Sequence, residues 1–286
     1  MEQLTTQIAL GLVSGALLVL LALGLNLIFG LLEFINFSHG ALYMLGAYVA
    51  VYLSTAFGAF WWALLLVPPI MGLVGVVLER TLIRPMYSRN QVDALLLTFG
   101  LTYVIIESVR IVAGSGGRSA RGPSELATQV SVGLGRTFPA YLLFVVVVVA
   151  LVVAGLWLFL QRTNVGLIVR AGIRDSVMIR ALGIHFDRYR VLVFAMGIAV
   201  AGLAGVLTGP ISGVYPEMGA DILVMAFVVV VIGGMGSFWG SVVSGLLIGL
   251  LVSLTTLYAS VYAGIAPFVL MILVMTFRPR GLLGAT

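Results

Sequence analysis

The sequence contains no cysteine and no lysine, and only 9% of its 286 residues are charged. The absence of cysteine excludes disulfides, zinc sites built on thiolates and cysteine nucleophiles. The absence of lysine excludes a phosphate-binding GxxxxGK[ST] loop and a Schiff-base lysine. If this protein uses ATP, another chain must therefore hydrolyse it.

Histidine is also scarce, with one residue at His39 and one at His185. The two lie on different segments and lack the spacing of metal ligands. The serines and threonines show no pairing with His and Asp that would suggest a nucleophile. We therefore expect no catalytic residue, no metal site and no cofactor bound by this chain.

Hydrophobic residues are abundant instead, at 62% of the chain, with a mean hydropathy of +1.21. Soluble domains carry about 25% charged residues, and a membrane-spanning helix needs about 20 apolar residues. The sequence therefore predicts an all-α, polytopic membrane protein, with a single transmembrane domain over 1–286 and about eight or nine membrane segments. The candidate segments are 8–32, 38–56, 60–79, 94–113, 139–160, 190–212, 222–233, 238–254 and 259–277.

The pair 222–233 and 238–254 is separated by a glycine-rich stretch that contains Gly233, Gly234, Gly236 and Gly240. The first member has about 12 residues, or roughly 18 Å of helix, which is short for a full crossing. We predict a broken or re-entrant element here, with these glycines at the break. Elsewhere, glycines four residues apart predict close helix packing, as at Gly11/Gly15 and Gly245/Gly249.

Arginine is distributed unevenly between the connecting loops. The loop 161–190 holds six arginines against two aspartates, and 80–93 and the tail 278–286 are also basic, whereas 213–221 has two acids and no base. Cytoplasmic loops carry the excess of basic residues, so we predict an external N-terminus and a cytoplasmic C-terminus. The loop 114–138 is a basic exception on the external side. The net charge of +5 thus reflects anchoring at a lipid bilayer, and we expect no nucleic-acid partner.

Polar residues gather between the first two apolar runs, at Asn26, Glu33, Asn36, Ser38 and His39. Such groups are costly in hydrocarbon and commonly line an enclosed or water-filled path, which favours a discontinuous helix pair at a translocation path. A short loop in which Asn36 and Ser38 cap the second helix explains the same residues. The two readings are compatible, and for His39 a structural hydrogen bond is favoured over a proton relay.

The basic loop contains an amphipathic segment at 165–184. We predict one short helix on the cytoplasmic side, ended by Gly183. The helix could lie at the lipid headgroups or dock onto a cytoplasmic partner, and the residue pattern alone favours the headgroups. Its apolar stripe would consist of Ile173, Val177, Ala181 and Ile184.

Two further features lie near the predicted outer surface. Glu107 and Arg110 are three residues apart on one span, a spacing that predicts an ion pair on one helix face. Glu217 and Asp221 are expected to be ordinary solvated loop charges.

Several motifs together resemble a known family. They are Gly24-Leu-Asn-Leu-Ile-Phe-Gly30, Asn36-Phe-Ser-His-Gly40, Arg170-Ala-Gly-x-x-Asp175, Ala181-Leu-Gly-Ile184, Gly233-Gly-Met-Gly-Ser-Phe-Trp-Gly240 and Phe277-Arg-Pro-Arg-Gly-Leu282. In this order they are similar to the permease subunits of bacterial ABC importers for branched-chain amino acids, and Asn36–Gly40 resembles the first of the two permease types.

This resemblance implies a transport subunit of the bacterial inner membrane rather than an enzyme. The implied partners are a sister permease in a heterodimer, two cytoplasmic ATPase subunits that hold ATP and Mg, and a periplasmic solute-binding protein. The polar residues from Asn26 to His39 would line or shape the translocation path. Coupling to the ATPase would fall to the basic loop, at Arg170, Ala171, Arg174, Asp175, Ala181, Leu182, Gly183 and Ile184.

The solute stays open at this point. Branched-chain or other hydrophobic amino acids suit a mostly apolar path, while urea, short amides or other small solutes fit the same family. An ion-coupled secondary carrier is the competing class, and it would need an intramembrane relay for which only Glu33, His39 and Glu107 are candidates.

Overall fold

The computed structural model describes residues 2–32, 34–131 and 137–284. In this part of the chain, seven helices are long and apolar enough to cross a membrane. They are α1 (Glu2–Leu32), α2 (Ser38–Phe57), α3 (Phe60–Leu78, extended by a π-turn η1 at Glu79–Ile83 and a 3-10 turn η2 at Arg84–Ser88), α4 (Gln91–Ala113), α5 (Ala140–Arg162), α8 (Phe186–Ser212) and α10 (Phe238–Ala259, extended by η4 at Ser260–Tyr262).

Shorter elements connect these helices. They are η3 (Ser124–Leu126), β1 (Gln129–Ser131), β2 (Thr137–Pro139), α6 (Asn164–Arg174), α7 (Ser176–Ala181), α9 (Met218–Gly233) and α11 (Ala266–Phe277). The two strands pair antiparallel, with Val130 opposite Phe138. The predicted all-α polytopic fold is therefore confirmed, with this small hairpin as its β-structure in the described ranges.

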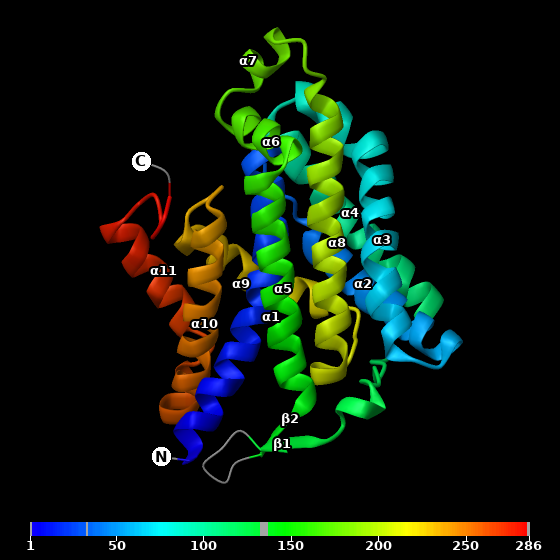
Figure 1. Cartoon of the computed structure of the whole chain (residues 1–286), viewed down its shortest axis with the longest axis vertical. Helices are drawn as coiled ribbons and strands as arrows, with labels where there is room; N and C mark the ends of the chain where they lie inside the picture. Colours follow the sequence, from blue (N-terminus) through cyan, green and yellow to red (C-terminus); the bar gives the residue numbers. More distant parts are fainter. Residues whose placement is uncertain (1, 33, 132–136, 285–286) are drawn as a thin grey trace.

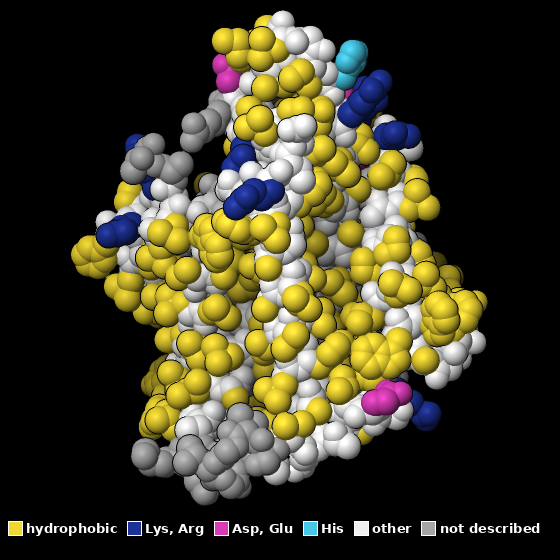
Figure 2. All heavy atoms as spheres, in the orientation of Figure 1, with side chains coloured by type: hydrophobic (Ala, Val, Ile, Leu, Met, Phe, Trp, Pro, Cys, Tyr) yellow, Lys and Arg dark blue, Asp and Glu magenta, His cyan; other side chains and the backbone are white. Residues whose placement is uncertain are grey.

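The helices form an elongated bundle whose interior is built around α1 and α8 (Figure 1). The N-terminus and the β1–β2 hairpin lie at one end, and α6, α7 and the C-terminus lie toward the other. Hydrophobic side chains cover the middle of the face shown in Figure 2, while charged side chains gather mainly toward the α6–α7 end. This is the surface expected of a bundle surrounded by lipid.

The last predicted span is wrong in its bounds. Instead of one helix over 259–277, α10 continues to Ala259, a 3-10 turn follows, and α11 begins only at Ala266. The 12 residues of α11 give about 18 Å of helix, less than the roughly 30 Å of hydrocarbon. Pro267 at the start of α11 explains its late beginning, because proline is favoured in the first turn of a helix.

The glycine pairs predicted to allow close packing do so between α1 and α10, which confirms that prediction. A Cβ on Gly249 would lie 2.3 Å from the backbone nitrogen of Gly15, and one on Gly245 would lie 2.6 Å from the Val19 side chain. The two helices therefore touch through their backbones along this seam.

A tight hairpin joins α9 to α10. The helix α9 ends at Gly233 and α10 begins at Phe238, with Gly234 and Gly236 in between at φ of +99° and +81°. A Cβ on Gly240 would lie 2.1 Å from the carbonyl oxygen of Gly233. A side chain at this position would therefore push the start of α10 away from the end of α9, and only glycine fits. With 16 residues, or about 24 Å, α9 is itself shorter than a full crossing.

Candidate functional site

The chain folds back on itself between α1 and α2. The Nε2 atom of His39, in the first turn of α2, lies 3.2 Å from the carbonyl oxygen of Leu21. Leu21 precedes the end of α1 by eleven residues, or about 16 Å of helix. Hence α2 begins beside α1, about three turns before the end of that helix, rather than beyond it.

The side chains at this fold-back build the start of α2. The Oδ1 atom of Asn36 accepts hydrogen bonds from the Ser38 amide at 3.1 Å and from its hydroxyl at 2.6 Å. The Phe37 amide donates to the hydroxyl of Thr98 on α4 at 3.2 Å. Asn36 and Thr98 thus satisfy the amides of Ser38 and Phe37 at the buried start of α2.

These polar groups are enclosed by protein. Asn36, Ser38, His39 and Thr98 are each 0% exposed. A carbonyl oxygen only accepts, so His39 Nε2 carries the hydrogen that reaches Leu21, and within the described residues His39 Nδ1 and Asn36 Nδ2 have no partner. Glu33, the remaining member of this stretch, lies outside the described residues.

Aromatic rings are exposed next to the enclosed cluster. Phe37 is 37% exposed and packs edge-on against Phe99 of α4 at 6.3 Å between ring centroids, and Phe99 packs against Tyr103 at 5.1 Å. The sequence interpretation missed these residues, although the spacing of four between Phe99 and Tyr103 places them on one helix face.

Asn26 is bound to the α9–α10 hairpin rather than to the α2 cluster. Its carboxamide nitrogen donates to the Ser237 carbonyl and to the Ser241 hydroxyl, both at 2.8 Å, and its oxygen accepts from the Gly236 amide at 2.6 Å. The structure thus brings together two features that the sequence interpretation treated separately, the polar stretch of α1 and the helix-break glycines.

The predicted single helix over 165–184 is wrong. Asp175 adopts an extended conformation between α6 and α7, and its Oδ1 atom accepts hydrogen bonds from the Val177 and Met178 amides at 2.9 Å each. Because this aspartate caps a second helix, Ile173 and Val177 do not share one continuous stripe. Gly183 follows α7 at a φ of +79°, which glycine adopts without strain.

The α6–α7 segment is held against the bundle from one side. Val169 and Ile179 are buried with Phe186 in one apolar cluster, and a Cβ on Gly172 would lie 2.0 Å from the Phe186 ring. Arg170 donates to Gln161 at the end of α5. The remaining predicted coupling residues lie along the same segment: Ala171 is half-buried in α6, Arg174 ends α6, Ala181 and Leu182 are exposed, and Ile184 is half-buried.

The free side of this segment is apolar. Val177, Met178 and Leu182 are 70%, 58% and 68% exposed, at the end of the molecule that carries most of the visible charge. Three large apolar side chains this exposed on a short capped helix form a surface suited to contact with another protein.

The opposite end of the bundle is held by ionic contacts. Arg110 pairs with Glu107 at 2.5 Å, as predicted, and also with Glu217 at 2.5 Å. Glu217 is exposed, as expected of a solvated loop charge, but it is also paired, and the hydrogen bond from Arg110 lowers the pKa of its carboxyl. Asp221 accepts a hydrogen bond from the Tyr215 hydroxyl at 3.1 Å.

The basic loop after α4 is also bound to the bundle. Arg118 exchanges backbone hydrogen bonds with Val214 at 2.7 and 2.9 Å, and its guanidinium donates to the Ala113 carbonyl at the end of α4. Arg118, one of the arginines that make the loop 114–138 basic, therefore has a structural role. Among the described residues, no group of three His, Cys, Asp or Glu side chains is placed to hold a metal ion.

Comparison with known proteins places the chain in a family. Residues 7–275 match the model of the branched-chain amino acid transport system permease component. The chain is 32% identical to the high-affinity branched-chain amino acid transport system permease protein LivH of Escherichia coli K12, over 96% of this chain and 93% of that protein. It is 30% identical to BraD of Pseudomonas aeruginosa, over 97% and 95%.

The second permease type matches more weakly. The permease protein LivM of Escherichia coli K12 is 27% identical, over 94% of this chain and 68% of that protein. No solved structure matches the chain. The protein is an integral membrane transport subunit and not an enzyme, and it belongs to the family of branched-chain amino acid ABC transporter permeases.

Proposed function

We propose that this chain is the LivH-type permease of an ATP-driven importer for branched-chain or other hydrophobic amino acids. It would pair with a sister permease of the second type, bind two cytoplasmic ATPase subunits that hold ATP and Mg, and receive its solute from a periplasmic binding protein. The full-length similarity to LivH and BraD supports the permease class, and the similarity to LivM supports a related sister chain.

The observation that carries this proposal is the exposed apolar surface of α7. A segment that only lay on lipid headgroups would turn its apolar side toward the bilayer. Here the side of the segment facing the bundle is occupied by Val169, Ile179 and Phe186, while Val177, Met178 and Leu182 remain exposed at its free end. A groove on a cytoplasmic ATPase is the partner that such a short helix fits.

This assignment fixes an orientation. If α7 contacts a cytoplasmic ATPase, the α6–α7 end and the C-terminus are cytoplasmic, and the N-terminus and the β1–β2 hairpin are external, as the arginine distribution also predicts.

The fold-back between α1 and α2 is proposed to shape the translocation path. In a heterodimer the path runs between two chains, so the residues that line it are exposed in one chain alone. Asn36, Ser38 and His39 are enclosed and would hold the start of α2 in place, while the neighbouring Phe37 and Phe99 present apolar surface to the path. Asn26 would act indirectly, by holding the α9–α10 hairpin.

The test is solute-stimulated ATP hydrolysis by the complete complex in proteoliposomes. Val177→Asp together with Met178→Asp is expected to abolish stimulation and co-purification of the ATPase while the permease still inserts. Val261→Asp is the matched control, because Val261 is 84% exposed at the opposite end. Unchanged stimulation in the double variant, or uptake driven by an ion gradient without ATP, would refute the proposal.

A further inference from the structure

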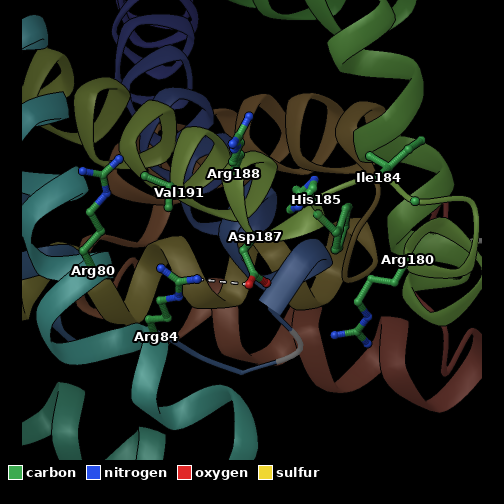
Figure 3. Close-up of a pocket in the computed structure, with 10 residues that line it drawn as sticks. Arg80, Arg84, Arg180, Ile184, His185, Asp187, Arg188 and Val191 are labelled. Carbon is green, nitrogen blue, oxygen red and sulfur yellow. Dashed lines mark hydrogen bonds and ion pairs between the residues drawn. The ribbon is translucent and has the colours of Figure 1, made fainter.

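An open pocket lies between the α3–α4 connection and the start of α8. Its volume is about 900 Å³, and Figure 3 shows the side chains that surround it. Arg80 and Arg84 enter from η1 and η2, Arg180 comes from α7, and Asp187 and Arg188 from the first turn of α8. Two segments far apart in the sequence, 80–84 and 180–191, thus bring arginines to one concave surface.

The charge of this pocket is unbalanced. Besides Arg180, which has a contact of its own, three arginines and one aspartate line it, a formal excess of two positive charges. The aspartate is already engaged, because Asp187 pairs with Arg84 at 3.2 Å and with Arg190 at 3.6 Å. Glu79 lies nearby but is fully buried, receives a hydrogen bond from Tyr87 and does not line the pocket. The excess of positive charge among the pocket's lining residues therefore favours the binding of an anion.

The backbone of α8 adds to this preference. His185 precedes the first residue of α8 and provides no side-chain cap, and the first turn of this 27-residue helix lines the pocket. The N-terminal amides of a helix carry partial positive charge and attract anions. This contribution acts in the same direction as the arginines.

The position of the pocket identifies the kind of anion. Arg80 is two residues beyond the last residue of α3, and Ile184, Phe186 and Val191 provide an apolar wall. The pocket thus lies where apolar spans give way to charged residues, which is the depth of the lipid headgroups. Basic pockets between transmembrane helices at this level bind anionic headgroups, and the guanidinium fork matches phosphate.

We propose that this pocket binds the phosphate headgroup of an anionic phospholipid. A bound headgroup would bridge the α3–α4 connection and the start of α8, the helix against which α6 packs. This lipid binding is separate from the proposed permease function and does not require it.

The test measures lipid retention by the full-length chain. The purified protein is offered equal amounts of phosphatidylglycerol and phosphatidylcholine, and the lipid that stays bound is counted by native mass spectrometry. We expect selective retention of phosphatidylglycerol. We also expect a loss of about 30-fold in its affinity when Arg80→Gln and Arg188→Gln are combined, because each arginine near an anionic surface contributes about 1 kcal/mol.

The matched control combines Arg89→Gln and Arg278→Gln, which removes the same charge from exposed residues outside the pocket. Its retention of phosphatidylglycerol is expected to equal that of the unaltered chain. The proposal is overturned if the unaltered chain retains both lipids equally, if the control loses as much as the pocket variant, or if millimolar inorganic phosphate abolishes the preference and so reveals a site for a soluble anion. If the double variant does not fold, the single variants Arg80→Gln and Arg188→Gln are each expected to lose about fivefold in affinity, and no loss in either overturns the proposal.

Discussion

Replacing Asn26 by leucine removes the side chain that joins α1 to the α9–α10 hairpin. Asn26 is 4% exposed and makes hydrogen bonds of 2.6, 2.8 and 2.8 Å to three different residues. Two of the partners keep another contact, because the Ser241 hydroxyl also donates to the Ser237 carbonyl at 3.3 Å and that carbonyl also accepts from the Ser241 amide at 3.1 Å. The Gly236 amide loses its partner.

The expected cost follows from these bonds. Side-chain hydrogen bonds between membrane helices contribute about 0.6 kcal/mol each, and an unpaired buried amide costs about 1–3 kcal/mol. We therefore expect Asn26→Leu to lower the free energy of unfolding by about 3 kcal/mol. The matched control is Thr256→Val on α10, whose exposed hydroxyl bonds only within its own helix; its effect is expected to stay within about 0.5 kcal/mol.

The assay is unfolding in mixed detergent micelles, followed by tryptophan fluorescence. Trp157 and Trp239 pack together at 6.4 Å, and both lie in a cavity lining that includes Asn26, so their emission reports on this region. A destabilisation below about 1 kcal/mol would show that the three bonds do not hold the hairpin. Lost transport at unchanged stability would instead indicate that Asn26 contacts the solute.

Three other substitutions test separate parts of the fold. Gly172→Ala is expected to lift α6 from α8, because its Cβ would lie 2.0 Å from the Phe186 ring; faster proteolysis within α6–α7, reversed by Phe186→Leu, is the measurement. Gly249→Ala is expected to lower the free energy of unfolding by at least about 2 kcal/mol, because its Cβ would overlap the backbone of α1. Gly100→Ala has open space around it and should raise the free energy of unfolding by about 0.5–1 kcal/mol. Equal effects of the two substitutions in thermal unfolding would contradict the close contact between α1 and α10. The lowered pKa of Glu217 means that its ion pair stabilises the fold fully above the ordinary value of 4.5, and that this stabilisation is lost as pH falls through the lowered value. The stability difference from Glu217→Gln should therefore be constant above pH 4.5, shrink below it and vanish in stronger acid.

The sequence predicted those features that depend on local composition. Long uncharged runs required helices across a membrane, and glycines four residues apart predicted close helix packing, which the structure shows between α1 and α10. The hydropathy pattern was less informative where an apolar stretch is not helical along its whole length, as at 259–277. Hydropathy alone did not distinguish the turn at 260–265 from helix, although Gly264 and Pro267 mark the change.

The α6–α7 segment shows how two local signals can conflict. Its apolar residues repeat at helical spacing, which predicted one helix, but Asp175 followed by Ser176 also fits a helix start. In the structure the cap prevails, since Asp175 Oδ1 satisfies two amides at the beginning of α7.

What the sequence determined by itself is the class of molecule: a lysine-free and cysteine-free membrane bundle, basic at one end, with polar residues placed in an apolar stretch. What only the tertiary structure decided is what those polar residues contact. Asn26 bonds to residues more than 200 positions later, and His39 reaches back to Leu21 because α2 begins beside α1. Buried polar groups must find hydrogen-bond partners wherever the fold supplies them, and in this bundle those partners come from helices that the sequence keeps far apart.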